Sequence, residues 1–533
     1  MSEFDYVIVG AGSAGCTLAA RLSEDPTVQV LLLEAGGKDR SPNVKIPAAF
    51  GKQFHTKLDW DYYTEPEPGC ANRSLYLPRG RMLGGSSSMN AMLYVRGRPL
   101  DYDLWESEGA EGWGWAGVEP YFKRAEDYSG GADEIHGAGG PLRTTKVRSP
   151  HELTNQFYAA AEAAGIPYTR DYNSPEQDGA GPAQVTQHSG ARWSTADAYL
   201  KPNLGRPNLT VRTKVKVVGL ELEGDRVVGV RVSAGRRGFE VLRPGRDVVL
   251  CAGSYGSPQL LMLSGIGPAG HLEQVGVQVR HDLPGVGQNL HDHPFCVCIW
   301  DAHDGPSLLD AEKPRAMLEW LLRRSGPLTS PVAEALAFVK TRAGLPAADV
   351  QFHMAPAYYV DHGATAYEGH AVTIGPVAIA PKSRGHVELR SSDPADAPRI
   401  LTNALTEPED VESMLAGMEL AREVAHSGPY ARSLGKELFP GEDVTDRQAL
   451  EDDLRSRVEL IYHPVGTCRM GSGDRAVVDS DLRVRGLEGL RVVDASIMPV
   501  IPGGNTNAPT IMVAEKAADH ILGRQGASVA AVG

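Results

Sequence analysis

The chain opens with a glycine-rich pattern that strongly limits how its first forty residues can fold. Residues 5–15, Asp-Tyr-Val-Ile-Val-Gly-Ala-Gly-Ser-Ala-Gly, read as a short apolar strand, a tight turn and the start of a helix of small residues. A second apolar run, residues 28–34, ends in Glu34. This order of strand, turn, helix, strand and acid is the fingerprint of a βαβ unit that binds a dinucleotide.

Each glycine of this fingerprint has a physical reason. Gly10 allows the tight turn, Gly12 lets the backbone approach a pyrophosphate, and Gly15 lets the helix lie close to the strand. The helix N-terminus offers free N–H groups to the phosphates, and Glu34 can accept a hydrogen bond from a ribose hydroxyl. The cofactor-binding residues predicted here are Gly10, Gly12, Ser13, Ala14, Gly15, Glu34 and Ala35. A glycine turn without a ligand is the alternative, and the pattern alone does not separate NAD from FAD.

Length, net charge and the number and spacing of cysteines limit the class of protein. With 533 residues the chain predicts two domains, and its formal net charge of −14 disfavours nucleic acid and anionic membranes as partners. Six scattered cysteines form no C-x-x-C pair, which favours a reducing compartment. The first strand begins within five residues of the N-terminus and no apolar run reaches ~18 residues, so we expect neither a signal peptide nor a membrane span. These features predict a cytoplasmic protein.

Periodicity predicts an α/β nucleotide-binding domain into which an α+β domain is inserted. Alternation in residues 209–218, 226–233 and 247–251 is typical of strands near the first unit, with Gly224-Asp225 as a hairpin turn. Alternation in 349–355, 371–380 and 386–389, with a helical pattern in 408–426, indicates an antiparallel sheet with helices on one face. Residues 490–494 would rejoin the first sheet. The predicted nucleotide-binding domain comprises residues 1–150, 205–295 and 461–525, the substrate domain comprises 151–204 and 296–460, and residues 526–533 form a flexible tail.

Three further blocks carry a family resemblance. They are Gly80-Arg-Met-Leu-Gly-Gly-Ser-Ser-Ser-Met-Asn-Ala-Met-Leu-Tyr-Val-Arg-Gly97, the segment from Gly253 to Gly267, and Tyr462-His-Pro-Val-Gly-Thr-Cys-Arg-Met-Gly471 followed by Asp494-Ala-Ser and Asn505-Thr-Asn. With the N-terminal fingerprint, they resemble the glucose–methanol–choline oxidoreductase family from Asp5 to about Ile521. The block around Asn90 looks more like the bacterial choline- and alcohol-dehydrogenase-type members. The resemblance implies a Rossmann-like FAD-binding domain with an inserted antiparallel-sheet substrate domain.

The resemblance also implies how FAD is held. In the family the Gly84-Gly85-Ser86-Ser87 loop lies along the diphosphate and flavin edge, Asn90 and Ala91 lie near the isoalloxazine, and the Val217 backbone meets the adenine. The cofactor-binding residues implied in this way are Arg81, Leu83, Gly84, Ser87, Asn90, Ala91, Met92, Val217, Ala252, Asp494, Ala495, Asn505 and Thr506. Some relatives carry a histidine that bonds covalently to the flavin where this chain has Met89, so we expect noncovalent FAD. Read without the family, the loop is also compatible with a plain glycine turn.

The second block is expected to be mostly structural. Ser257 is a favourable N-cap residue and Pro258 is favoured at the first helical position, so a helix is predicted to start there. Gly265-Ile-Gly267 would end it. Only its entry, Ala252-Gly253-Ser254, is placed to contact the cofactor.

Two residues are predicted to carry the chemistry. Removing a proton from an alcohol needs a base with a pKa near working pH, which suits histidine. In the family the histidine at the place of His463 is the active-site base, and the second position, eleven residues after the aspartate of Asp-Ala-Ser, is Asn505 here. Its amide can donate to the substrate oxygen and stabilise a forming alkoxide. A helix beginning at Asn507-Ala508-Pro509 is predicted to aim its N-terminus at the pyrimidine side of the flavin. The alternative to these catalytic roles is that His463 is a structural histidine and Asn505 a turn residue.

The predicted reaction is FAD-dependent oxidation of a small-molecule alcohol, expected to be primary, to an aldehyde or ketone. The reduced flavin would be reoxidised by O2, as in an oxidase, or by an artificial or quinone-type carrier, as in a dehydrogenase. A non-redox lyase or decarboxylase of the same fold and a flavoprotein without catalysis stay as alternatives, and the histidine at 463 favours oxidation. The oligomeric state is left open.

Other candidate residues receive less weight. His291-Asp292-His293 resembles a metal pair on one face of a strand, but no third ligand is evident and no metal is expected. Tyr358, Tyr359 and Glu334 fall in the inserted domain, where they could line the substrate side or pack within the sheet.

Overall fold

The N-terminal pattern folds as the predicted βαβ unit in the computed structural model, which describes residues 3–233, 238–303, 307–524 and 526. The predicted tail, apart from Gly526, lies outside the described residues. A parallel sheet of order β11-β2-β1-β15-β28 forms around the unit. Its elements are β1 (Phe4–Val9), α1 (Ser13–Leu22), β2 (Val30–Glu34), β11 (Leu209–Thr213), β15 (Pro244–Leu250) and β28 (Leu490–Val492). The return of residues 490–494 to this sheet is therefore confirmed.

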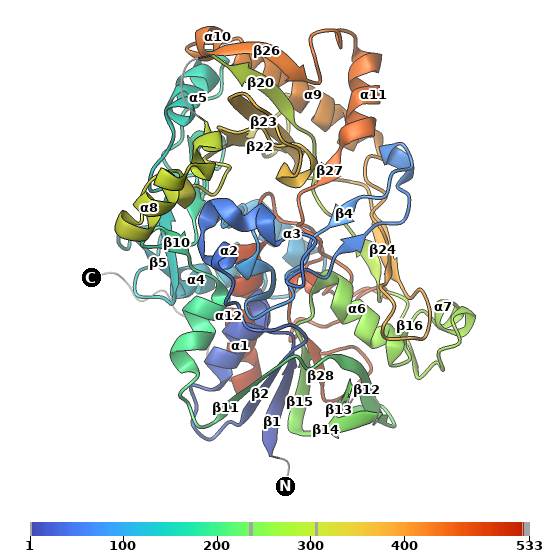
Figure 1. Cartoon of the computed structure of the whole chain (residues 1–533). Coiled ribbons are helices and arrows are strands. Elements are labelled where there is room, and N and C mark those ends of the chain that lie inside the picture. Colours follow the sequence, from blue (N-terminus) through green and yellow to red (C-terminus); the bar gives the residue numbers. More distant parts are fainter. Residues whose placement is uncertain (1–2, 234–237, 304–306, 525, 527–533) are drawn as a thin grey trace.

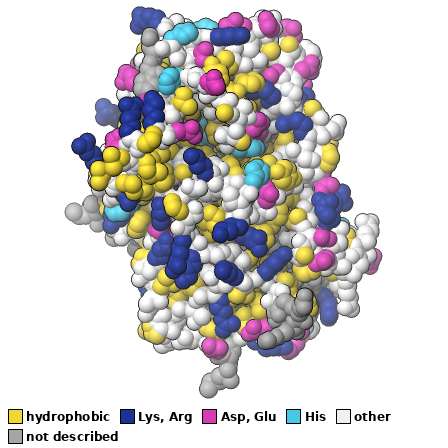
Figure 2. Space-filling view, in the orientation of Figure 1, with side chains coloured by type: hydrophobic (Ala, Val, Ile, Leu, Met, Phe, Trp, Pro, Cys, Tyr) yellow, Lys and Arg dark blue, Asp and Glu magenta, His cyan; other side chains and the backbone are white. Residues whose placement is uncertain are grey.

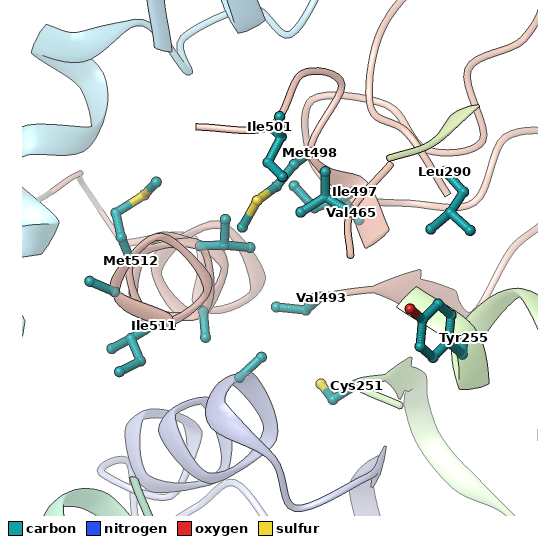
Figure 3. Close-up of a cluster of buried hydrophobic side chains, with 14 of the residues drawn as sticks. Cys251, Tyr255, Leu290, Val465, Val493, Ile497, Met498, Ile501, Ile511 and Met512 are labelled. Carbon is teal, nitrogen blue, oxygen red and sulfur yellow. The ribbon is translucent and has the colours of Figure 1, made fainter. Parts of the chain in front are cut away.

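Two helices lie together against this parallel sheet. Helix α12 (Asn507–Leu522) packs along α1, although the two are almost five hundred residues apart in sequence. Figure 3 shows Ile511 and Met512 of α12 in one buried cluster with Val493 and Cys251, which follow β28 and β15. Helices from the first and last parts of the described chain thus lie side by side next to the parallel sheet (Figure 1).

The inserted region forms an antiparallel sheet, as the alternation predicts. The order along it is β26-β20-β23-β22-β21-β7, with β19 and β27 attached at one side. Its strands are β7 (Gly179–Pro182), β19 (Pro294–Phe295), β20 (Cys298–Ala302), β21 (Ala335–Val339), β22 (Val350–Ala355), β23 (Ala371–Ala378), β26 (Leu434–Phe439) and β27 (Glu459–Leu460). Helices α5 (Glu152–Ala163) and α9 (Pro408–Ala425) pack against it. Because successive side chains of a strand face opposite sides, Gln351 and His353 of β22 lie on one face, and Val350, Phe352 and Met354 on the other.

The remaining helices and strands form smaller sheets and connecting segments. The helices are α2 (Pro42–Lys45), α3 (Pro99–Ser107), α4 (Trp115–Ala125), α6 (Gly253–Leu263), α7 (Ala269–Gln274), α8 (Pro314–Arg323), α10 (Tyr430–Ser433) and α11 (Arg447–Arg457). The strands are β3 (Tyr62–Tyr63), β4 (Tyr76–Leu77), β5 (Glu126–Tyr128), β6 (Leu142–Lys146), β8 (Gln184–Val185), β9 (Gln187–His188), β10 (Ala191–Arg192), β12 (Val217–Glu223), β13 (Arg226–Ser233), β14 (Phe239–Leu242), β16 (Ile266–Gly267), β17 (His281–Asp282), β18 (Gln288–Leu290), β24 (Gly385–Glu388) and β25 (Arg399–Leu401).

Two local predictions were wrong. Residues 209–218 are not one strand, because β11 ends at Thr213 and the chain turns at Lys214 (φ +61°) before β12, which pairs with β13 across the predicted Gly224-Asp225 turn. Helix α6 begins at Gly253, so Pro258 lies inside it. Since proline has no N–H to bond the carbonyl four residues earlier, the Ser254 oxygen is free to accept the Thr467 hydroxyl at 2.6 Å. This hydrogen bond ties α6 to the block that contains His463.

The outer face of α8 is apolar and uncovered. Leu318, Leu321 and Leu322 are 58%, 57% and 74% exposed, and Figure 2 shows apolar side chains gathered over α8 with Lys and Arg side chains around them. Ala316 and Trp320 hold the opposite face of the helix to the body of the protein. Within the described ranges, no helix has both the length and the apolar character that crossing a bilayer requires.

A buried charge network joins three segments of the region before β7. The His136 ring bonds Glu126 at 2.9 Å through Nδ1 and Asp171 at 2.7 Å through Nε2, and Arg96 bonds the same Glu126 carboxylate at 2.6 Å. Burial alone would lower the pKa of His136, but its hydrogen bonds to Asp171 and Glu126 outweigh burial and raise this pKa to about 9. The imidazolium is therefore the form that stabilises the fold.

We predict that the His136→Gln variant loses a stabilisation that depends on pH. The folded pKa lies above the unfolded value of 6.5, so the stabilisation is complete below pH 6.5 and disappears as pH rises through about 9. The pH-dependent part is about 3 kcal/mol. Urea unfolding of both proteins at pH 6 and pH 9.5 measures it, and an equal difference in stability at the two pH values would contradict the prediction.

Candidate active site

One cavity of about 600 Å³ lies between the two sheets. Its lining includes residues at the carboxyl ends of the parallel strands, among them Gly10, Glu34 and Ala252, and residues of the antiparallel sheet, among them His353 and Thr373. Ligands of open α/β sheets bind outside the carboxyl ends of the strands. The cavity therefore joins the expected nucleotide position to the inserted sheet.

The fingerprint glycines meet different neighbours. A Cβ atom on Gly15 would lie 1.9 Å from the Gly10 carbonyl oxygen, and one on Gly10, where φ is +103°, would lie 2.5 Å from the Cys251 oxygen. A Cβ atom on Gly12 would meet nothing within 4 Å, because Gly12 faces the cavity. Gly10 and Gly15 are thus required by packing, whereas Gly12 leaves room for a ligand.

The carboxylate of Glu34 is held by backbone N–H groups at the end of β2. Ala11 N–H donates to Oε2 at 3.0 Å and Gly36 N–H donates to Oε1 at 2.7 Å. Burial raises the pKa of Glu34 to about 7 despite these hydrogen bonds. The side chain lines the cavity, in the position from which a ribose hydroxyl is expected to be bound.

Two helix N-termini converge on the cavity. Helix α1 begins at Ser13 and α12 begins at Asn507, and the Ser13 hydroxyl donates to Asn507 Oδ1 at 2.7 Å. Both residues line the cavity, so the free N–H groups of both helices lie at its wall. A bound anion would be stabilised there by both helix dipoles. The helix start at Asn507 is confirmed, and its direction toward the flavin stays a prediction.

Most of the predicted site residues line this one cavity. They are Gly10, Gly12, Ser13, Ala14, Glu34, Ala35, Arg81, Asn90, Ala91, Met92, Val217, Ala252, His463, Asp494, Ala495, Asn505 and Thr506. Gly15, Leu83, Gly84 and Ser87 are absent from the lining. The last two shape the loop, because Gly84 N–H donates to Ala11 O at 2.7 Å and the Ser87 hydroxyl donates to Gly84 O at 2.6 Å.

His463 is held by neighbours on three sides. Its backbone N–H donates to Asp292 Oδ1 at 2.7 Å, its Nδ1 lies 3.1 Å from His293 Nδ1, and its Nε2 lies 3.1 Å from Asn505 Nδ2. Gln351 Nε2 in turn donates to Asn505 Oδ1 at 3.2 Å. Residues from four separate parts of the sequence thus fix the imidazole and the carboxamide beside each other.

Burial controls the charge of this cluster. Burial and the neighbouring imidazoles of His293 and His353 lower the pKa of His463 well below 6.5. Burial also lowers the pKa of His293 and of His353 to about 3. The three imidazoles are therefore neutral at pH 7, and His463 is available as a base.

His353 is a cavity residue that the sequence reasoning missed. It is 8% exposed, it lines the cavity, and its Nε2 has no hydrogen-bond partner among the described residues. The available signal was the alternation Val-Gln-Phe-His-Met-Ala in residues 350–355, which places two polar side chains on the same face of an apolar strand. An unpaired buried nitrogen of this kind is suited to a polar group of the ligand.

Aromatic and aliphatic side chains form much of the wall near the two catalytic candidates. Phe295 lies between His353 and Tyr359, at ring-centre distances of 6.2 and 6.5 Å, and Phe54 lies 6.1 Å from Tyr462. The inserted-domain residues that could either line the substrate side or pack within the sheet divide between these roles. Tyr359 lines the cavity, whereas Glu334 accepts hydrogen bonds from His151 N–H and the Thr154 hydroxyl.

The suspected metal pair has other partners. His291 Nδ1 contacts Asn289 O at 2.7 Å and its Nε2 accepts from Ile501 N–H at 2.9 Å, while His293 contacts His463. Neither histidine lies in a strand, contrary to the prediction, because β18 ends at Leu290 and β19 begins at Pro294. Over the residues that the structure describes, no group of three His, Cys, Asp or Glu side chains is arranged to hold a metal ion.

A parallel nucleotide-binding sheet and an antiparallel sheet share a cavity with a neutral imidazole, an arrangement that suits a dinucleotide-dependent oxidoreductase. Residues 4–295 and 381–514 match the N- and C-terminal profiles of GMC oxidoreductase, and the chain belongs to this family. It is therefore an FAD-dependent oxidoreductase that acts on CH–OH donors.

Relatives and solved structures agree with this assignment. The chain is 44% identical to an uncharacterised GMC-type oxidoreductase of Mycobacterium tuberculosis over 527 residues, covering 98% of this chain and 99% of the relative. It is 43% identical to an oxygen-dependent choline dehydrogenase of Brucella ovis, covering 98% and 96%. The structure is similar to that of pyridoxine 4-oxidase from Mesorbium loti, with a TM-score of 0.89, 35% identity and coverage of 98% and 100%.

The residues present fit FAD. Gly12 leaves space at the turn, two helix N-termini meet the cavity wall, and Glu34 stands at the end of the second strand. The residues expected near the isoalloxazine, Asn90 and Ala91, line the same cavity as His463 and Asn505. One cavity can therefore hold both the dinucleotide and the substrate carbon.

We predict that alanine substitutions at Gly12 and Gly15 have different effects. Gly12→Ala should fold with an unchanged melting temperature but bind FAD at least tenfold more weakly, because its methyl group occupies cavity space that the pyrophosphate needs. Gly15→Ala should lose several kcal/mol of stability, because its methyl group overlaps the Gly10 carbonyl. Thermal unfolding and FAD titration of both apoproteins test this. Equal FAD affinity in Gly12→Ala and wild type would contradict it.

Proposed function

We propose that this protein oxidises a primary alcohol with an apolar or aromatic substituent to the aldehyde, with His463 as the base and Asn505 as a hydrogen-bond donor. The observation that carries the proposal is the contact of a neutral, buried imidazole with a carboxamide in the cavity that also contains the nucleotide-binding turn. FAD bound there supplies a hydride acceptor. We infer that it is held noncovalently, since Met89, which lines the cavity, offers no nucleophile for the linkage known in some relatives.

The hydrogen bonds indicate how His463 takes a proton. With the Asn505 amide oriented as in the structure, its Nδ2–H points at His463 Nε2, so Nε2 carries the lone pair and Nδ1 carries the proton. Nδ1–H then donates to His293 Nδ1. A substrate hydroxyl that enters beside Asn505 can give its proton to Nε2, while the amide donates to the resulting alkoxide.

The cavity wall supports the proposed substrate class. The acidic side chains in the lining are Glu34, Asp396 and Asp494, and none of them contacts His463, Asn505 or His353. Asp292, which accepts the His463 backbone N–H, does not line the cavity, so among the described lining residues a cationic alcohol would find no carboxylate in contact with the two catalytic candidates. Choline is the second candidate, because Phe295, Tyr359 and Tyr462 offer aromatic faces that can bind a quaternary ammonium group.

The acceptor and the cellular setting complete the proposal. We infer that O2 or a quinone-type carrier reoxidises the flavin and that the protein works in the cytoplasm, which its six free cysteines favour. A non-redox lyase or decarboxylase of the same fold is the alternative, and the His463–Asn505 pair favours oxidation over both.

We predict that anaerobic addition of benzyl alcohol or 1-hexanol bleaches the flavin absorbance at concentrations at least tenfold lower than choline does. The reason is that an apolar wall gains free energy from burying an apolar substituent. Stopped-flow absorbance measures the bleaching, and admitting air then shows whether O2 restores the colour. A flavin that no alcohol bleaches would support the lyase or a flavoprotein without catalysis, and a preference for choline would support the second candidate.

We predict that His463→Gln lowers kcat/KM about 10²- to 10⁴-fold, the usual contribution of a general base. His271→Gln is the matched control, because His271 accepts a backbone hydrogen bond from Leu389 and does not line the cavity. Since burial lowers the pKa of His463 well below 6.5, the wild-type kcat/KM should stay level from pH 8 to 6.5 and fall only at lower pH. An acidic limb centred above pH 6.5 would count against His463 as the base.

A further inference from the structure

Arg192 is a buried cation that makes no ion pair with a carboxylate of the described residues. It is 1% exposed, and its guanidinium donates to Val44 O at 2.8 Å, to Ser87 O at 3.2 Å and to Asn90 Oδ1 at 2.7 Å. Its Nη2 has no hydrogen-bond partner, and no Asp or Glu of the described residues forms an ion pair with it. By contrast, Arg96 is equally buried and pairs with Glu126.

The surroundings leave the charge of Arg192 uncompensated. Burial lowers the pKa of Arg192 to about 9, and Asp197 is the acid that opposes this shift. The Asp197 carboxylate already accepts hydrogen bonds from Lys45 and Lys201. Because an unpaired buried charge is costly, a cation in this place indicates a role beyond packing.

The contact with Asn90 determines which end of that amide faces the cavity. Asn90 Oδ1 accepts from Arg192 Nη1 at 2.7 Å and from Met92 N–H at 3.0 Å, so both of its acceptor positions are used. Met92 has a φ of +62°, and the hydrogen bond from its N–H helps to hold this strained turn. Asn90 lines the cavity, and the group that it has left to offer a ligand is the Nδ2 donor.

We propose that Arg192 is a positioning residue that fixes and polarises Asn90, so that the Asn90 amide stabilises the negative charge that the FAD ring gains on reduction. The proposal rests on the proposed function and on the expected position of Asn90 beside the isoalloxazine, and Asn90 lines the same cavity as His463. A guanidinium on Oδ1 draws electron density from the amide and strengthens its N–H groups as donors. Because the guanidinium is charged and buried, it polarises the Asn90 amide strongly.

The test is the reduction potential of the bound flavin in Arg192→Gln, Arg192→Lys and Asn90→Ala holoproteins. In Arg192→Gln, reduced FAD should lose about tenfold in affinity relative to oxidised FAD, which lowers the two-electron midpoint potential by about 30 mV. Arg192→Lys keeps the charge and should recover part of this loss. Asn90→Ala should lower the potential, and adding Arg192→Gln to it should lower the potential little further.

Two controls separate this role from a structural one. Lys516→Gln removes another buried cation, one that donates to the Gly112 and Gly117 carbonyls and does not line the cavity, and it should leave the potential unchanged. A merely structural Arg192 would lower the melting temperature and the FAD content while the remaining bound flavin keeps the wild-type potential. If Arg192→Gln does not fold, Asn90→Ala, which retains Arg192, still tests whether the Asn90 amide raises the potential of the flavin.

The outcomes are distinct. A wild-type potential in a folded Arg192→Gln or in Asn90→Ala would overturn the proposal, as would a full additional drop in the double variant. The potential is measured by equilibration with a reference dye under chemical reduction, so it requires no alcohol turnover. A failure of the proposed alcohol oxidation therefore shows separately, as a flavin that the dye method reduces and no alcohol bleaches.

Discussion

The contact between Gly15 and the Gly10 carbonyl is the constraint on which the nucleotide half of the molecule depends. Only a residue without a Cβ atom allows α1 to lie this close to the turn after β1. This approach brings the N-terminus of α1 to the cavity beside the open face of Gly12. The same packing lets α12 lie along α1, so that a second helix N-terminus, from the far end of the chain, meets the first through Ser13 and Asn507.

The chemical half depends on a dry, crowded polar cluster. Asp292 and His293 from one segment and Asn505 from another bond His463, and Gln351 donates to Asn505. Burial keeps the imidazoles neutral, so His463 can act as the proposed base at neutral pH, while the neighbouring Asp292 carboxylate accepts its backbone N–H and not its ring. In the proposed function, selectivity for a substrate is left to the aromatic wall and to His353 Nε2, which has no hydrogen-bond partner among the described residues.

Sequence reasoning succeeded where a short pattern has one physical solution. The glycine spacing predicted the βαβ unit, and the alternation in residues 349–355 and 371–380 predicted β22 and β23. It failed at Ser257-Pro258, because a side-chain hydrogen bond from Thr467 compensates for the proline inside α6, and Thr467 is more than two hundred residues away. It also missed His353, whose value comes from the cavity that its strand faces, and Arg192, whose partner Asn90 lies in another block.

The sequence by itself determined much of the local geometry and the family: which turns need glycine, where α1 and α12 begin, and which blocks identify a GMC oxidoreductase. Only the tertiary structure decided which polar groups share one water-free space, and therefore which imidazole is neutral and which amide end faces the ligand. The physical reason is distance. Backbone preferences act over a few neighbouring residues, whereas burial and hydrogen bonding depend on segments that meet only when the two sheets close around the cavity.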